Sequence, residues 1–142
     1  MRLTVNGTQI AHMSAGVLLD DERPDERLFE IEAHFHQEDD CRYGALFVTT
    51  EFIEDRQHLL VGGVVHFTSD SPLNEASDEE VIQATVEAGL HNAAYDACAI
   101  LARQMKGVLD FALEIDPRTP DVTITVDRAP AEVTEDSDMA GK

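Results

Sequence analysis

The chain of 142 residues contains no tryptophan, only two cysteines and few aromatic residues. Any core must therefore be built mainly from Val, Leu, Ile, Ala and the six Phe. Cys41 and Cys98 stand far apart and form no Cys-x-x-Cys pair, so we expect free thiols rather than a disulfide framework. No apolar run approaches the roughly 18 residues of a membrane-spanning helix, and no secretory leader pattern is present. These absences favour a cytoplasmic protein that does not insert into membranes.

Basic residues are also scarce: ten Lys and Arg stand against 29 Asp and Glu, for a net charge of −19. Such a chain repels the phosphates of nucleic acids, so direct binding of DNA or RNA is disfavoured. The charge suits a protein that meets a basic partner or mimics a nucleic acid. It equally suits a solvated surface that reflects a GC-rich or salt-adapted genome.

Alternating apolar and polar residues predict several strands in the first half of the chain. The strand over 28–36 is the clearest, because Phe29, Ile31, Ala33 and Phe35 share one face. Asn6-Gly7 is a turn signal, and Gly62-Gly63 suggests a bulge or a close approach of another backbone. The short connections favour an antiparallel meander. Extended segments are predicted over 2–6, 8–19, 28–36, 43–53 and 58–68, with a charged linker over 20–26.

A long helix follows. Ser77 and Glu80 have the spacing of a capping box, and the helix is expected to run to about Met105, bent or split at Gly89. Its small residues Ala93 and Ala97, with Leu101, fall on one face, which either packs on the protein's own sheet or contacts a second subunit. Two short strands over 108–115 and 122–126 are expected next. The predicted architecture is a single α+β domain over 1–127, an antiparallel sheet with a long helix on one side, followed by a disordered acidic tail over 128–142.

Motifs of catalysis are absent from the sequence. No Gly-x-Ser-x-Gly, phosphate-binding glycine loop or activated cysteine occurs, so we expect no enzyme activity, no catalytic residue and no cofactor. His34 and His36 share a strand face close to Glu32, an arrangement that can hold a divalent ion. Two solvent-facing histidines explain this pattern equally well, so no metal site is assigned.

Four consecutive pieces of the region from about Leu59 to Arg118 carry a resemblance: GGVVHFTSDSP, SDEEVIQATVEAGL, AAYDACAILARQM and KGVLDFALEI. Their order, a strand ending in a Phe, an acidic loop, a long helix with Tyr95 and then a glycine, resembles the SecB family of protein-export chaperones. It is most similar to the SecB-like members found beside toxin–antitoxin pairs in actinobacteria. The family's Pro-Tyr-x-Arg run, its Pro-Pro pair and its second C-terminal helix are missing here.

The resemblance implies an ATP-independent holdase that binds unfolded or aggregation-prone proteins in apolar grooves and assembles as a homo-dimer or tetramer. Candidate subunit-contact residues are Ala93, Ala97 and Leu101. Candidate client-binding residues, chosen from the predicted strands, are Phe29, Phe35, Phe47, Phe52, Val65 and Phe67. Acidic positions that could meet a basic partner or client segment are Glu30, Glu32, Asp70 and Glu75.

Two other functions fit the same sequence. An inhibitory acidic protein of a phage or mobile element would mimic DNA, although its acids follow no regular spacing. A dedicated interaction module would have the same fold, bind one partner and lack holdase activity.

Overall fold

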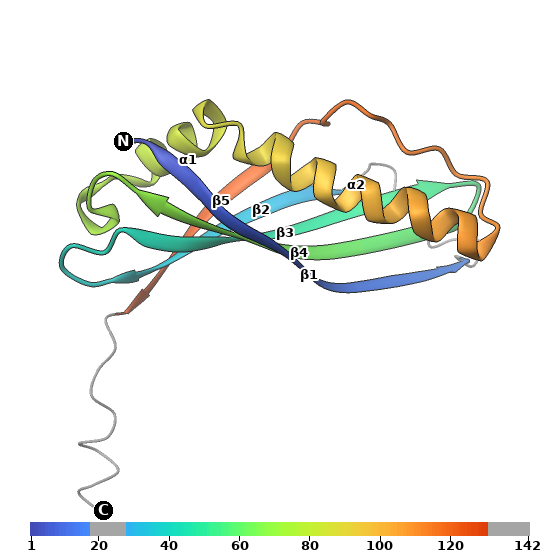
Figure 1. The fold of residues 1–142 in the computed structure, drawn as a ribbon, viewed down its shortest axis with the longest axis horizontal. Coiled ribbons are helices and arrows are strands. Elements are labelled where there is room, and N and C mark those ends of the chain that lie inside the picture. Colours follow the sequence, from blue (N-terminus) through green and yellow to red (C-terminus); the bar gives the residue numbers. More distant parts are fainter. Residues whose placement is uncertain (18–27, 131–142) are drawn as a thin grey trace, which may run out of the picture.

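Strands occupy the first half of the chain, and the two helices and a last strand follow (Figure 1). The computed structural model describes residues 1–17 and 28–130, and the predicted linker over 20–26 lies outside them. The α+β class is confirmed. The elements are β1 (Leu3–Val17), β2 (Phe29–Gln37), β3 (Tyr43–Glu54), β4 (Gln57–Ser69), a 3₁₀ turn η1 (Leu73–Glu75), α1 (Asp78–Glu87), α2 (Leu90–Leu109) and β5 (Thr123–Pro130).

The strands form one sheet in the order β1-β4-β3-β2-β5. The central β2, β3 and β4 are the predicted meander, and the β3–β4 connection is the two-residue loop Asp55–Arg56. Both loop residues have positive φ, 47° and 70°, which suits the right-handed twist of a tight hairpin. The sheet is mixed rather than purely antiparallel, because β5 pairs in parallel with β2. Alternation of apolar and polar residues along a strand shows which residues share a face, but not which other strand pairs with it. The sequence therefore did not predict this pairing.

The edge strand β1 is one long strand rather than two extended pieces. Asn6-Gly7 lies inside it, at the first of two register shifts, and the second shift lies between Ile10 and His12. The second shift faces Gly62 and Gly63 of β4. A Cβ at Gly62 would lie 2.4 Å from the ring of His12, and one at Gly63 would lie 3.2 Å from the carbonyl oxygen of Gln9. The predicted bulge and close approach are therefore confirmed, with the bulged residue on β1.

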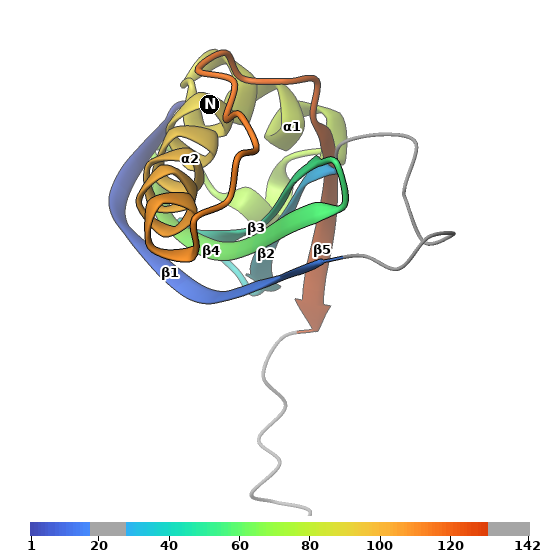
Figure 2. The same cartoon turned by 90° about the vertical axis from the view of Figure 1, so that its right-hand side faces the viewer.

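Both helices lie on the same face of a curved sheet (Figure 2). Ser77 caps α1 by accepting a hydrogen bond from the backbone N–H of Glu80 at 3.2 Å. Gly89, with φ of 72°, separates α1 from α2, so the predicted split is confirmed. Tyr95 packs edge-on against Phe29 with ring centroids 5.5 Å apart, and its hydroxyl donates to the carbonyl of Asp116 at 2.6 Å. No helix among the described residues is long and apolar enough to cross a membrane.

The segment after α2 corrects two predictions. The helix does not stop near Met105 but continues to Leu109 and ends on Asp110, which has a left-handed φ of 57°. The prediction of a strand over 108–115 is wrong. The backbone that follows α2 forms hydrogen bonds with side chains instead of pairing with a strand. The Gln57 side-chain oxygen accepts from the N–H groups of Ala112 and Leu113 at 2.7 and 3.2 Å.

The last described strand, β5, extends to Pro130, three residues beyond the expected domain end at 127. The rest of the predicted tail, from 131 onward, lies outside the described residues. Of the two short strands expected near the end of the domain, the one over 122–126 is therefore present and longer than expected.

Candidate functional site

The face of the sheet opposite the helices is called here the open face, because no described helix covers it (Figure 2). The alternation along β2 separates the two faces. Phe29, Ile31, Ala33 and Phe35 are buried beneath the helices, while Glu30, Glu32, His34 and His36 point to the open face. An amphipathic strand thus sends its apolar side to the core and a set of ionisable groups to solvent.

Phe47 is a large apolar side chain on the open face. It lies on β3 between Glu32 of β2 and Val64 of β4, and 47% of its surface is exposed. Its exposed surface gains free energy when a partner covers it.

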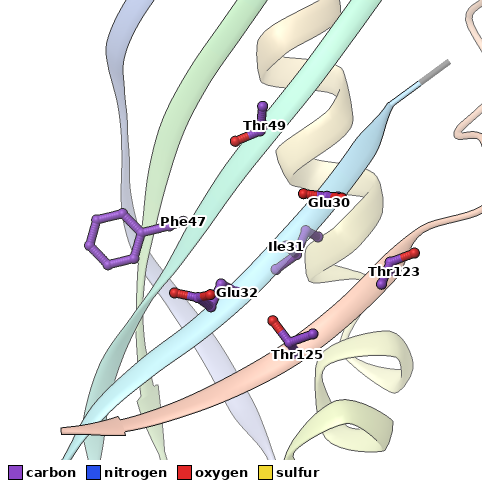
Figure 3. A pocket seen from close by; sticks show the side chains of 7 residues that line it. All are labelled: Glu30, Ile31, Glu32, Phe47, Thr49, Thr123 and Thr125. Carbon is purple, nitrogen blue, oxygen red and sulfur yellow. The ribbon is translucent and has the colours of Figure 1, made fainter. Parts of the chain in front are cut away.

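A hollow of about 380 Å³ lies beside Phe47 (Figure 3). Its rim carries the carboxylates of Glu30 and Glu32 from β2 and the hydroxyls of Thr49, Thr123 and Thr125 from β3 and β5. Among the residues that the structure describes, no Lys or Arg lines this hollow. The arrangement offers an apolar contact next to two negative charges, which suits a segment that has an apolar side chain followed by a basic one.

A second hollow of similar size, about 380 Å³, lies on the other side of Phe47. Its lining is more apolar and includes Tyr43, of which 58% is exposed, and the rings of His34, His36 and His66. Phe47 therefore stands between an acidic hollow and an aromatic one. Together the two hollows form one surface of apolar, acidic and aromatic side chains around Phe47.

Of the six residues predicted to bind clients, only Phe47 is exposed on this surface, although Phe35 borders the second hollow. The other five point toward the helices, and each is at most 3% exposed, so they are core residues and the prediction of an exposed groove is wrong for them. Because a strand is pleated, the residues on its apolar side all point toward the protein's own helices. The five core residues are Phe29, Phe35, Phe52, Val65 and Phe67.

The acidic positions divide in the same way. Glu30 and Glu32 lie at the rim of the hollow beside Phe47, whereas Asp70 and Glu75 lie outside it. Asp70 accepts a hydrogen bond from the backbone N–H of Arg2 at 2.7 Å, and this bond holds the pKa of its carboxyl below the usual range. Asp70 therefore fastens the first strand, and Glu30 with Glu32 provides the charge of the candidate site.

Of the predicted subunit-contact residues, Ala93 lies on the exposed side of α2, whereas Leu101 packs partly against the core. Ala93 is exposed, and Ala97 and Leu101 are half-buried. Nearby Ile100 is 55% exposed, whereas Ala94, Cys98 and Ala102 on the opposite side of the helix are buried in the core. We call Ala93, Ala97, Ile100 and Leu101 the α2 stripe. It is apolar, and no described element covers it fully.

The cysteines offer no reactive centre. Both are buried, and burial raises the pKa of the Cys98 thiol, an effect that the Thr50 hydroxyl opposes in part. A protonated thiol enclosed in the core is a poor nucleophile.

Comparison with known proteins supports the fold. No family model and no curated protein matches the sequence. Among solved structures, the chain is similar to the SecB-like chaperone Rv1957 of Mycobacterium tuberculosis, solved in complex with a ChAD peptide from the antitoxin HigA1 (Rv1956). The two are 13% identical, with a TM-score of 0.59, over 84% of this chain and 88% of that chain. The likeness shows a SecB-like fold.

Proposed function

We propose that this protein is an ATP-independent, SecB-like chaperone that holds segments of partner proteins on its open face. The observation that carries the proposal is Phe47, exposed between an acidic and an aromatic hollow on a sheet face that no described helix covers. The SecB-like fold and the peptide complex of the similar mycobacterial chaperone support it.

The chemistry of the surface sets the kind of segment that it binds. Phe47 and Tyr43 supply apolar area, and Glu30 with Glu32 supplies negative charge for a Lys or Arg of the client. Covering the exposed 47% of Phe47 contributes about 0.7–1.4 kcal/mol, and the ordering of the bound segment offsets part of it. Binding of this strength is reversible and needs no nucleotide for release.

The overall charge supports the same function. A net charge of −19 keeps a complex with an aggregation-prone client soluble and favours clients with basic segments. In this proposal the chain acts in the cytoplasm as a homo-oligomer, dimer or tetramer, with the α2 stripe as the subunit contact.

Suppression of aggregation tests the proposal. Two unrelated model proteins are diluted from denaturant with and without the chaperone, in the absence of ATP, and turbidity is followed. We expect suppression of both, and a roughly tenfold higher concentration requirement for Phe47→Ser, since about 1.4 kcal/mol corresponds to a factor of ten. Val86→Ser is the matched control, because Val86 of α1 is 44% exposed but lies outside the open face.

The alternative is a dedicated module for one partner, as the single antitoxin peptide in the mycobacterial complex would suggest. That alternative predicts no suppression for either model protein. Equal loss of activity in Phe47→Ser and Val86→Ser would contradict the assignment of the open face.

A further inference from the structure

We infer that Glu32, His34 and Asp127 bind one divalent transition-metal ion of the zinc class. One ligand atom from each side chain lies within 4.8 Å of the others. Glu32 and His34 stand two residues apart on the open face of β2, and Asp127 is the register partner of His34 on the parallel strand β5. The site therefore spans two strands that are far apart in the sequence.

The arrangement around the imidazole is the main evidence. Nε2 of His34 contacts the Glu32 carboxylate, and Nδ1 lies 3.1 Å from the Asp127 carboxylate. A neutral imidazole has only one N–H, so it can donate to only one of these carboxylates. The other contact is satisfied either by a second ring proton or by a cation held between the ring nitrogen and the carboxylate. A metal ion is one cation that can be held there, because each of the three side chains brings a ligand atom to the cluster.

The ligand set selects the metal. Imidazole nitrogen with carboxylate oxygens suits zinc and related transition metals, whereas Mg²⁺ and Ca²⁺ prefer oxygen alone. Zinc–ligand bonds of about 2.0–2.2 Å place neighbouring ligands roughly 3.4 Å apart. The His34–Glu32 contact must therefore open and the widest separation in the cluster, up to 4.8 Å, must close. The side chains of Glu32 and Asp127 are 50% and 56% exposed and have room to rotate.

The imidazole itself is held in place. The ring of His34 stands edge-on to Phe47, with centroids 4.4 Å apart and an interplanar angle of 77°. One side of the ring is thereby covered and the side facing the carboxylates stays accessible, since 29% of the His34 side chain is exposed. Water can complete the coordination. His36, the other histidine of the His-x-His pair, is not in the cluster.

Isothermal titration tests the site on the full chain, treated with chelator and then titrated with ZnCl₂ or with MgCl₂ at neutral pH. We expect one Zn²⁺ per chain and no measurable Mg²⁺ binding. His34→Ala and Asp127→Asn should each weaken Zn²⁺ binding at least tenfold. His36→Ala and His66→Ala, histidines of the same face outside the cluster, should change it less than twofold.

A second measurement separates a ligand role from loss of folding. Because Asp127 lies on an edge strand joined to β2, bound Zn²⁺ should slow amide hydrogen exchange across β5, and chelator should reverse the effect. Several results would overturn the inference: absence of Zn²⁺ binding, equal weakening in His36→Ala, or unchanged exchange in β5. Because no client is present, the outcome is independent of the chaperone test.

Discussion

The guanidinium of Arg128 lies over the ring of Phe35, its register partner on the neighbouring parallel strand, with the guanidinium carbon 4.9 Å from the ring centroid. The same guanidinium donates to the carbonyl of Ala76 at 2.6 Å and to the carboxylate of Asp78 at 2.8 Å. One side chain thus ties the last described strand to the start of α1. Its side chain is only 24% exposed, so these contacts are partly shielded from water.

We expect Arg128→Ala to lower the free energy of unfolding by about 2–3 kcal/mol, because hydrogen bonds to charged groups and a shielded cation–π contact are lost together. Arg128→Lys keeps the positive charge but not the planar guanidinium with its several N–H donors. Its free energy of unfolding should therefore fall by about half as much. Urea denaturation measures both. The control is Arg118→Ala, whose side chain is 89% exposed and should change stability by no more than about 0.5 kcal/mol. Equal effects at the two arginines would contradict the role of Arg128.

Cys98 gives a prediction about pH. Burial raises the pKa of its thiol above the ordinary value of 9.0, so the folded protein keeps the proton at a pH where the unfolded chain loses it. The contribution of Cys98 to stability is therefore complete below about pH 8 and falls as the pH rises past 9, by at most about 1.4 kcal/mol per pH unit.

Denaturant titrations of the wild type and of Cys98→Ala between pH 7 and 10 measure this effect. Other groups titrate in both proteins, so the informative quantity is the difference between the free energies of unfolding of the two proteins. That difference should be constant up to about pH 8 and then shrink. A difference that stays constant to pH 10 would show that Cys98 ionises equally in the folded and unfolded chains.

The features that the sequence predicted correctly are those that depend on near neighbours in the chain. The period of two between Phe29 and Phe35 identified β2 and its two faces, and the Ser77–Glu80 spacing located the start of α1. Gly89 marked the break between the helices because it adopts a positive φ. Each of these depends on side chains fewer than ten positions apart.

The features that were missed depend on pairing between distant segments. The apolar pattern over 108–115 resembles a strand, but Gln57 binds that backbone and leaves it without a strand partner. The parallel pairing of β5 with β2 brings Asp127 beside His34, and no local pattern reports it. The sequence named Glu32, His34 and His36 as possible ligands without assigning a metal site, and it did not bring in Asp127, which lies beside Glu32 and His34 in the structure.

The same limit applies to the candidate client residues. A strand pattern shows that Phe29 and Phe35 share a face, but not whether a helix or a client covers that face. The covering helices were also predicted, and their placement over the apolar face would have assigned both residues to the core. Phe47 differs because it shares the other face with Glu32, to which it is paired.

The α2 stripe supports a prediction about assembly. Ala97 is half-buried, and the larger apolar side chain of Ile100 beside it is 55% exposed, so this side of α2 is open to a second copy of the chain. A carboxylate at position 97 would have to be desolvated in a helix–helix contact, which costs several kcal/mol without a partner charge. In a free subunit the same carboxylate would reach solvent, because Ala97 lies at the margin of the core.

We therefore expect Ala97→Glu to produce folded monomers, with the oligomer mass measured by light scattering and folding by circular dichroism. Asn92→Glu is the matched control: it adds the same charge to the same helix, at an exposed position outside the α2 stripe, and should leave the oligomer intact. Loss of folding in Ala97→Glu would show that this side of α2 belongs to the core of a single chain. An unchanged oligomer would place the subunit contact elsewhere, and the long edge strand β1, with Ile10 and Val17 exposed, would be the next surface to test.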